Sequence, residues 1–286
     1  MDATLGLGGH TEALLALDPQ ASVLGIDVDG QALQIARSRL AKFGRRFTPI
    51  KEGYMNLGAL LKNSSYPEPD GILADLGVSS LQLDRAERGF SFQRPGPLDM
   101  RMDASGGETA LDLIRRSSED DLARILKDYG EELLARPIAR RLKEASLREN
   151  LTDTAACAKI IASVYGARRS RESKINPATR TFQALRMAVN RETQNLGHFL
   201  AEAPLLLARG GHLVCISFHS LEDRKVKESF RALSRGCVCP SDFPKCVCGK
   251  TEKFRMLNKK PVAPREDEIA RNPRSRSAKM RGLERI

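Results

Sequence analysis

A glycine-rich turn near the start of the chain is the first feature that could bind a ligand. Residues 6–10, Gly-Leu-Gly-Gly-His, lie between a short apolar segment and residues 11–17, which have helical character. Glycines let the backbone turn sharply and approach a ligand closely, and a helix N-terminus offers N–H groups to polar ligand atoms. Alone this signal is weak, because a tight turn between a strand and a helix uses the same residues.

An acidic residue further along the chain strengthens the interpretation of a ligand site. Asp27 lies 18 residues after Gly9, near the end of the β-branched apolar run at residues 23–28. A carboxylate at the end of the second strand can accept hydrogen bonds from both ribose hydroxyls of a nucleoside. Asp27 could instead cap the following helix, but Asp29 can fill that role. The turn and Asp27 together therefore predict nucleoside binding.

Asp75 is a second acid at a predicted strand end, directly after the short apolar strand at residues 71–74. Open α/β sheets bind their ligands at the carboxyl edge of the strands. An acid there suits a cationic sulfonium or an amine better than a pyrophosphate. In addition, Thr11 replaces the third glycine of the dinucleotide fingerprint G-x-G-x-x-G. The alternative is an aspartate that caps nearby backbone N–H groups at the start of a loop.

A polar cluster also follows the predicted strand at residues 212–218. His219 and Ser220 would lie at the same edge of the sheet, where they could hold a target base or a phosphate. Ser220 is also expected to cap the helix that begins at Leu221, with acidic residues of the first turn complementing the helix dipole. Whether His219 faces the site stays open at this point.

Four of the six cysteines are grouped around a proline-containing loop as two C-x-C pairs. Four thiolates at that density could close a tetrahedral zinc site, although the usual spacing of paired ligands is C-x-x-C. Free thiols on a surface loop are the alternative, so the sequence alone assigns no metal ligand. The grouped residues are Cys237, Cys239, Cys246 and Cys248. Cys157 and Cys215 lie in apolar patterns and are expected in the core.

Alternating apolar strands and amphipathic helices would position these residues. Up to residue 80 the order is β-α-β-α-β, which implies a parallel sheet with helices on both faces. Residues 86–190 show helical periodicity and no convincing strand, with Ser118 as a predicted N-cap, and a strand and a helix then return. We therefore predict an α/β domain interrupted by an all-helical insert. The predicted segments are 1–85, 86–190 and 191–286.

The first predicted strand is unusually short. At most five residues precede the glycine-rich turn, although a strand in this place is normally central in a doubly wound sheet. We therefore expect the natural chain to carry further residues ahead of Met1.

The composition is that of a globular chain with an excess of positive charge. The 286 residues carry a net charge of +11, and 41% of them are hydrophobic. No apolar run reaches the roughly 18 residues of a membrane span, and the first residues lack a signal peptide. We therefore expect a cytoplasmic protein without a membrane partner. Residues 250–286 hold twelve Lys or Arg and five Asp or Glu, which favours a polyanion partner, with a partly disordered basic tail as the alternative.

Several longer strings resemble one family along nearly the whole chain. They are DLGVSSLQLD at 75–84, ERGFSF at 87–92, GPLDMRMD at 96–103, TFQALR at 181–186, SFHSLEDR at 217–224 and NPRSRSAK at 272–279. These strings are similar to those of the bacterial small-subunit ribosomal RNA cytosine-N4 methyltransferase family, and the similarity runs from Asp2 to the end. The resemblance implies a Rossmann-like class I methyltransferase domain with a helical insert.

The resemblance also implies S-adenosylmethionine as the cofactor. Asp27 matches the ribose-binding acid of the family, and the glycine-rich turn matches its own. Met55 aligns best with a family aromatic that stacks near the adenine, although Tyr54 could serve instead. The residues assigned to the cofactor in this way are Gly8, Gly9, His10, Asp27, Met55, Asp75 and Gln82.

The implied reaction is methylation of the N4 amine of a specific cytosine in 16S ribosomal RNA. The implied partner is ribosomal RNA within the assembled or nearly assembled small subunit, and no DNA. Asp75 is the first candidate for a catalytic electrostatic role, and His219 is the next, because both follow strands at one sheet edge. Two other classes are weighed against it. A Rossmann oxidoreductase conflicts with Thr11 and Asp75, and a catalytically silent RNA-binding or ribosome-assembly protein is the main alternative.

Overall fold

The computed structural model describes residues 1–172, 176–237, 239, 245 and 247–286. It divides the chain into two compact units, which are described separately below. One unit combines Met1–Gly77 with Thr193–Ile286, and the other is Val78–Glu192. In the described part of the chain, no helix is both long enough and apolar enough to cross a membrane.

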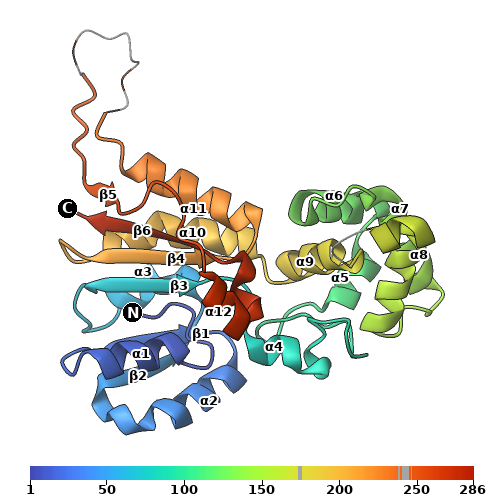
Figure 1. Cartoon of the computed structure of the whole chain (residues 1–286), viewed down its shortest axis with the longest axis horizontal. Helices are drawn as coiled ribbons and strands as arrows, with labels where there is room; N and C mark the ends of the chain where they lie inside the picture. Colours follow the sequence, from blue (N-terminus) through green and yellow to red (C-terminus); the bar gives the residue numbers. More distant parts are fainter. Residues whose placement is uncertain (173–175, 238, 240–244, 246) are drawn as a thin grey trace. The chain divides into compact units, whose positions relative to one another are not determined.

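The first unit is built on a mostly parallel sheet (Figure 1). Within it β1 pairs with β2 and β3 pairs with β4 in parallel, whereas β6 runs antiparallel to both β4 and β5. The strands are β1 (Val23–Asp27), β2 (Phe47–Lys51), β3 (Gly71–Asp75), β4 (His212–Ser217), β5 (Phe254–Met256) and β6 (Lys279–Arg285).

Residues 1–5 join the two halves of this sheet. Asp2 forms parallel bridges with Gly25 of β1 and Leu73 of β3. Its backbone N–H donates to Leu24 O at 2.9 Å, and Ala3 N donates to Leu73 O at 2.8 Å. The order across the sheet is therefore β2, β1, residues 1–5, β3, β4, β6, β5. The short first segment occupies the central place that the sequence predicted.

Strand β1 shows why helices cover both faces of the sheet. Successive side chains of a strand point to opposite faces, and here Leu24 and Ile26 pack in one buried cluster with Phe199, while Val23 packs in another with Leu33. The first cluster includes residues of α3, α10 and α11, and the second includes residues of α1 and α2. The predicted doubly wound arrangement is confirmed. The helices are α1 (Gly9–Leu17), α2 (Gly30–Leu40), α3 (Leu57–Lys62), α10 (Glu192–Leu206), α11 (Ser220–Leu233) and α12 (Glu266–Arg271), with 3-10 turns η1 (Ala41–Arg46), η2 (Tyr54–Asn56) and η4 (Pro273–Ser277).

The second unit contains helices joined by loops, and no strand among its described residues. Ser118 caps α6 by accepting a hydrogen bond from Asp121 N at 3.1 Å, as predicted, and Thr109 caps α5 in a reciprocal capping box. Leu122 and Leu126 of α6 belong to the apolar core of this unit. Its helices are α4 (Ser80–Asp84), η3 (Ala86–Arg88), α5 (Ala110–Arg116), α6 (Glu119–Gly130), α7 (Ala135–Leu147), α8 (Thr154–Glu172) and α9 (Ala178–Val189).

The C-terminal segment corrects one of the sequence-based alternatives. Instead of a partly disordered basic tail, it contributes β5, α12 and β6, and residues 279–284 of β6 pair with β4 in the sheet. Arg281 of β6 is only 3% exposed, and its Nε lies 2.7 Å from Asp223 Oδ1. A paired charge therefore stands where a strand pattern would predict an apolar residue.

Candidate functional site

The glycine-rich turn forms the start of α1. Gly8 is its N-cap with φ 79° and ψ 21°, a left-handed conformation, and a Cβ there would lie 2.8 Å from Leu40 Cδ1. No side chain caps the helix, so its first N–H groups have no side-chain acceptor. Gly9 is exposed, and no atom lies within 4 Å of the position of a Cβ there. The turn thus presents an open backbone surface.

Asp27 connects this turn to the end of β1. Its Oδ2 accepts a hydrogen bond from Gly6 N at 2.7 Å, and its Oδ1 accepts one from Asp29 N at 2.8 Å. Burial raises the pKa of Asp27 to about 6, because the charged form loses solvation. Asp29 caps α2 through Gln31 N at 3.0 Å, as predicted. Each oxygen of Asp27 keeps a second lone pair for a ligand hydroxyl.

Asp75 meets His10 across the same edge of the sheet. His10 Nε2 lies 3.2 Å from Asp75 Oδ2, and this hydrogen bond raises the pKa of the imidazole. Asp75 N donates to Thr4 Oγ1 at 2.6 Å, which fixes the end of β3. Asp75 Oδ1 is buried and has no hydrogen-bond partner among the described residues. A buried acceptor without a donor is costly, so this oxygen suits a ligand that brings a donor or a positive charge.

The structure separates the roles of Tyr54 and Met55. The Tyr54 ring packs edge to face on Phe199 with centroids 5.4 Å apart, so Tyr54 belongs to the core of the sheet. The Met55 sulfur folds over Gly53 at the position that a Cβ would occupy there. Val28, which follows β1, also lies within 3.7 Å of that position. Both residues are partly exposed, and Met55 is the one that packs beside the end of β1.

His219 acts as the N-cap of α11, which corrects the expectation for Ser220. Its Nδ1 accepts a long hydrogen bond, 3.4 Å, from Glu222 N, and Ser220 is already the first helical residue. An accepting Nδ1 places the proton of a neutral ring on Nε2. That nitrogen lies 3.1 Å from Glu222 Oε1 but is not aligned for a hydrogen bond, so we treat the pair as an electrostatic contact. The ring is 12% exposed and is committed to the helix start.

Gln82 has a local structural role in the helical unit. It forms a capping box with Ser79: Ser79 N donates to Gln82 Oε1 at 3.0 Å, and Gln82 N donates to Ser79 Oγ at 3.3 Å. Its side chain is 4% exposed. Gln82 belongs to the unit Val78–Glu192, and its assignment to the cofactor stays a prediction.

Three polar residues that support the site were not predicted from the sequence. Asp2 is fully buried and accepts hydrogen bonds from Thr11 Oγ1 at 2.7 Å and from Thr4 N at 3.3 Å. Desolvation raises the pKa of Asp2. Thr4 in turn holds the backbone of Asp75. A charged residue inside a central strand of five residues was the signal, since such a side chain needs buried partners.

The arrangement fits a ligand that carries hydroxyl groups and a positive charge. Asp27 offers acceptors for hydroxyls, Asp75 offers a carboxylate with a free buried oxygen, and Gly9 leaves space for close approach. These residues come from α1 and from the ends of β1 and β3, which residues 1–5 join directly. The predicted edge of the sheet therefore gathers the glycine-rich turn and both acids.

Comparison with known proteins gives a consistent result over the whole chain. A family model described as the MraW methylase family matches residues 1–286. A ribosomal RNA small subunit methyltransferase H from Anaeromyxobacter sp. (strain K) is 50% identical over 286 residues, which is 100% of this chain and 91% of that protein. Two proteins with the same name, from Geobacter sulfurreducens and Syntrophus aciditrophicus, are 47% and 46% identical to this chain over 287 residues. Each match includes 100% of this chain, together with 92% of the Geobacter protein and 91% of the Syntrophus protein.

Proposed function

Because the chain belongs to the MraW methylase family, we propose that it is an S-adenosylmethionine-dependent methyltransferase. Its proposed product is the N4-methylated form of one specific cytosine in 16S ribosomal RNA. The observation that carries the proposal is Asp75, whose two carboxylate oxygens differ: Oδ2 contacts His10, and Oδ1 is buried without a donor. This free acceptor lies at the sheet edge that also holds Asp27 and the glycine-rich turn.

The residues at this edge suit S-adenosylmethionine. When bound, the cofactor supplies a methyl group activated by a positively charged sulfur. Asp27 would accept hydrogen bonds from the ribose hydroxyls, and the exposed Gly9 and His10 would allow close approach in the turn that Gly8 shapes. Met55 would contact the adenine from beside the end of β1. We also assign Gln82 to the cofactor, on the basis of the family resemblance alone.

Asp75 is the proposed catalytic residue. The exocyclic amine of cytosine is a poor nucleophile, because its lone pair is delocalised into the ring. A carboxylate that accepts a hydrogen bond from the N4–H favours the pyramidal form of the amine and holds the proton as the N–C bond forms. His219 is the second catalytic candidate. Its cap geometry supports a positioning role, in which the side chain fixes the loop after β4.

The proposed partner is small-subunit ribosomal RNA in the assembled or nearly assembled subunit, in the cytoplasm, with no role for DNA or a membrane. A cytosine stacked in RNA must be swung out to reach a cofactor. Exposed basic side chains of the C-terminal segment, including Lys259, Lys260 and Arg276, would bind the surrounding phosphates.

The test is mass mapping of methylated nucleosides in 16S ribosomal RNA from a strain that lacks this gene. The strain should lose N4-methylation at one cytosine, and purified protein with S-adenosylmethionine should restore it on isolated small subunits. Asp75→Asn protein should bind the subunit without restoring it. If wild-type protein binds subunits and cofactor but transfers no methyl group, the silent assembly protein is the correct alternative.

A further inference from the structure

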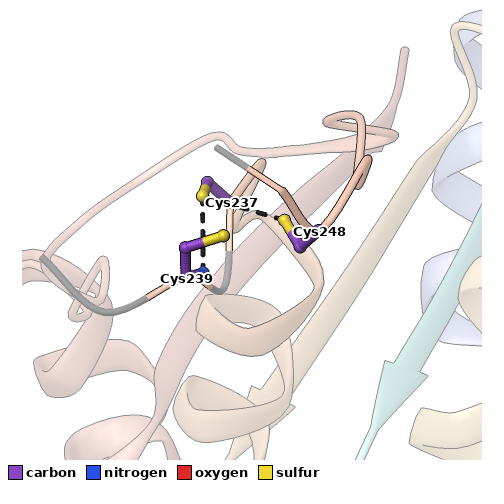
Figure 2. A group of neighbouring side chains, drawn as sticks. All are labelled: Cys237, Cys239 and Cys248. Carbon is purple, nitrogen blue, oxygen red and sulfur yellow. Dashed lines mark hydrogen bonds between the residues drawn. The ribbon is translucent and has the colours of Figure 1, made fainter. Parts of the chain in front are cut away.

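Three cysteines gather at the base of the loop between α11 and β5. Cys237 follows the end of α11, and Cys248 precedes β5. The sulfur atoms of Cys237, Cys239 and Cys248 all lie within 4.8 Å of one another (Figure 2). The base of the loop is also held by Lys250, whose Nζ donates to Ala232 O at 3.2 Å. The fold brings together three cysteine sulfurs, which are soft metal ligands, from both ends of one loop.

The spacing of the sulfur atoms matches ligands that share one ion. Cys248 Sγ lies 3.8 Å from Cys237 Sγ. Zinc–sulfur bonds are about 2.3 Å long, so two sulfurs on a tetrahedral zinc are about 3.8 Å apart. The two sulfurs of a disulfide are only about 2 Å apart. The contact between Cys248 Sγ and Cys237 Sγ, drawn as a hydrogen bond in Figure 2, is too long for a disulfide and equals the separation of two ligands on one metal ion.

Backbone N–H groups point at two of the three sulfurs. Cys239 N donates to Cys237 Sγ at 3.4 Å, and Val247 N donates to Cys239 Sγ at 3.4 Å. Such donors stabilise the thiolate, which is the form that binds a metal. The two core cysteines differ, because burial raises the pKa of Cys157 to about 12 and also raises that of Cys215. Among the described cysteines, Cys237, Cys239 and Cys248 are the three that lie close enough together to bind one ion.

We propose that Cys237, Cys239 and Cys248 bind one zinc ion that clips the two ends of this loop together. The three thiolates fill three positions of a tetrahedral ion, and a water molecule can fill the fourth. We assign the ion a structural role, because the site lies apart from the proposed catalytic acids in sequence. Cys246, which the sequence analysis grouped with these three, lies outside the described residues, and the proposal does not use it. The inference is independent of the methyl transfer.

The first test measures the zinc content of the full-length, untagged protein, purified with a reducing agent and without chelator. Wild type should carry about one zinc per chain by elemental mass spectrometry. Cys237→Ser, Cys239→Ser and Cys248→Ser should each lose most of it. Cys157→Ala and Cys215→Ala are matched controls that should keep it, because these thiols are buried in the two cores. A wild-type protein that takes up no zinc when the ion is added would overturn the proposal.

A second measurement uses wild-type protein, so that it does not depend on how the variants fold. The zinc is removed with a chelator and replaced by Co²⁺. A tetrahedral thiolate site should give intense visible bands and sulfur-to-cobalt charge-transfer absorption in the near ultraviolet. These bands should vanish on back-titration with one equivalent of Zn²⁺. Their absence in a chain whose circular dichroism is native would contradict the assignment.

Discussion

Two aspartates, one at the end of β3 and one in the first turn of α11, have opposite surroundings. Asp75, the last residue of β3, contacts His10 through Oδ2, and its Oδ1 is buried without a hydrogen-bond partner among the described residues. Asp223, in the first turn of α11, is held by Arg281 at 2.7 Å and by Lys279 at 3.5 Å. Desolvation is the largest single influence and raises the pKa of Asp223, but the hydrogen bonds and charges of Arg281 and Lys279 together outweigh it, so that this pKa lies below its ordinary value. A carboxylate whose partners are all internal stabilises the fold, whereas one with an unused buried oxygen is available to a ligand.

The largest expected difference between the two aspartates is in the rate of methyl transfer, which should depend on Asp75. Asp75→Asn should lower the rate of methyl transfer by about 10²- to 10³-fold, because it removes the charge that acts on the amine and the sulfonium. The melting temperature should change little, since no internal ion pair is broken apart from the contact with His10. Single-turnover methylation of small subunits, with melting measured alongside, checks both parts. A variant with a wild-type rate would remove Asp75 from the mechanism.

The matched substitution at Asp223 should have the reverse pattern. Asp223→Asn leaves the buried guanidinium of Arg281 without its counter-charge, so the free energy of unfolding should fall by about 3 kcal/mol. Urea denaturation measures this loss. Methyl transfer per folded molecule should stay at the wild-type level at a temperature where both proteins are folded. If activity falls while stability is kept, the division between the two aspartates is wrong.

Asp27 should control cofactor affinity and its dependence on pH. Asp27→Asn should weaken S-adenosylmethionine binding by about tenfold, because a charged acceptor for the ribose is lost. Since the pKa of Asp27 is about 6, the carboxylate is charged above that pH and is protonated as the pH falls below it. Wild-type affinity should therefore fall as the pH drops from 7 to 5. Calorimetric titration of wild type and variant at several pH values measures the difference, which should close at low pH.

The smallest expected effects, on stability and on cofactor affinity, distinguish the adjacent residues Gly8 and Gly9. Gly8→Ala places a Cβ in a left-handed conformation, 2.8 Å from Leu40, and should cost about 1–3 kcal/mol of stability. Gly9→Ala meets no atom within 4 Å and should change stability by less than about 0.5 kcal/mol. Its effect should instead be a several-fold loss of cofactor affinity. If folded Gly9→Ala protein binds the cofactor as tightly as wild type, Gly9 does not line the ligand site.

The sequence predicted the parts of the fold that depend on local patterns. The glycine-rich turn, the cap at Asp29 and the strands ending at Asp27 and Asp75 all follow from local spacing. The C-terminal strand β6 could not be predicted from local spacing, because Arg281 is buried by pairing with Asp223, which is distant in sequence. Such tertiary partners override the apolar periodicity on which strand prediction depends.

The same limit applies to the site. The sequence placed both acids at one sheet edge, but the buried contacts of Asp2 and Thr4 behind Asp75 depend on strand neighbours that only the fold defines. The cap of α11 was assigned to Ser220, because an imidazole is a less usual N-cap than a hydroxyl. The sequence could not decide between Tyr54 and Met55, because the contact of Tyr54 with Phe199 joins two different elements and is visible only in the folded chain.

The central claim is that the charge of Asp75 faces a positively charged sulfur, and one comparison tests it most directly. S-adenosylmethionine carries that charge, and S-adenosylhomocysteine lacks both the charge and the methyl group. Calorimetric titration of wild-type and Asp75→Asn protein with both ligands should show that the substitution weakens the charged ligand about tenfold more than the neutral one. Equal weakening of the two, or none, would contradict the account.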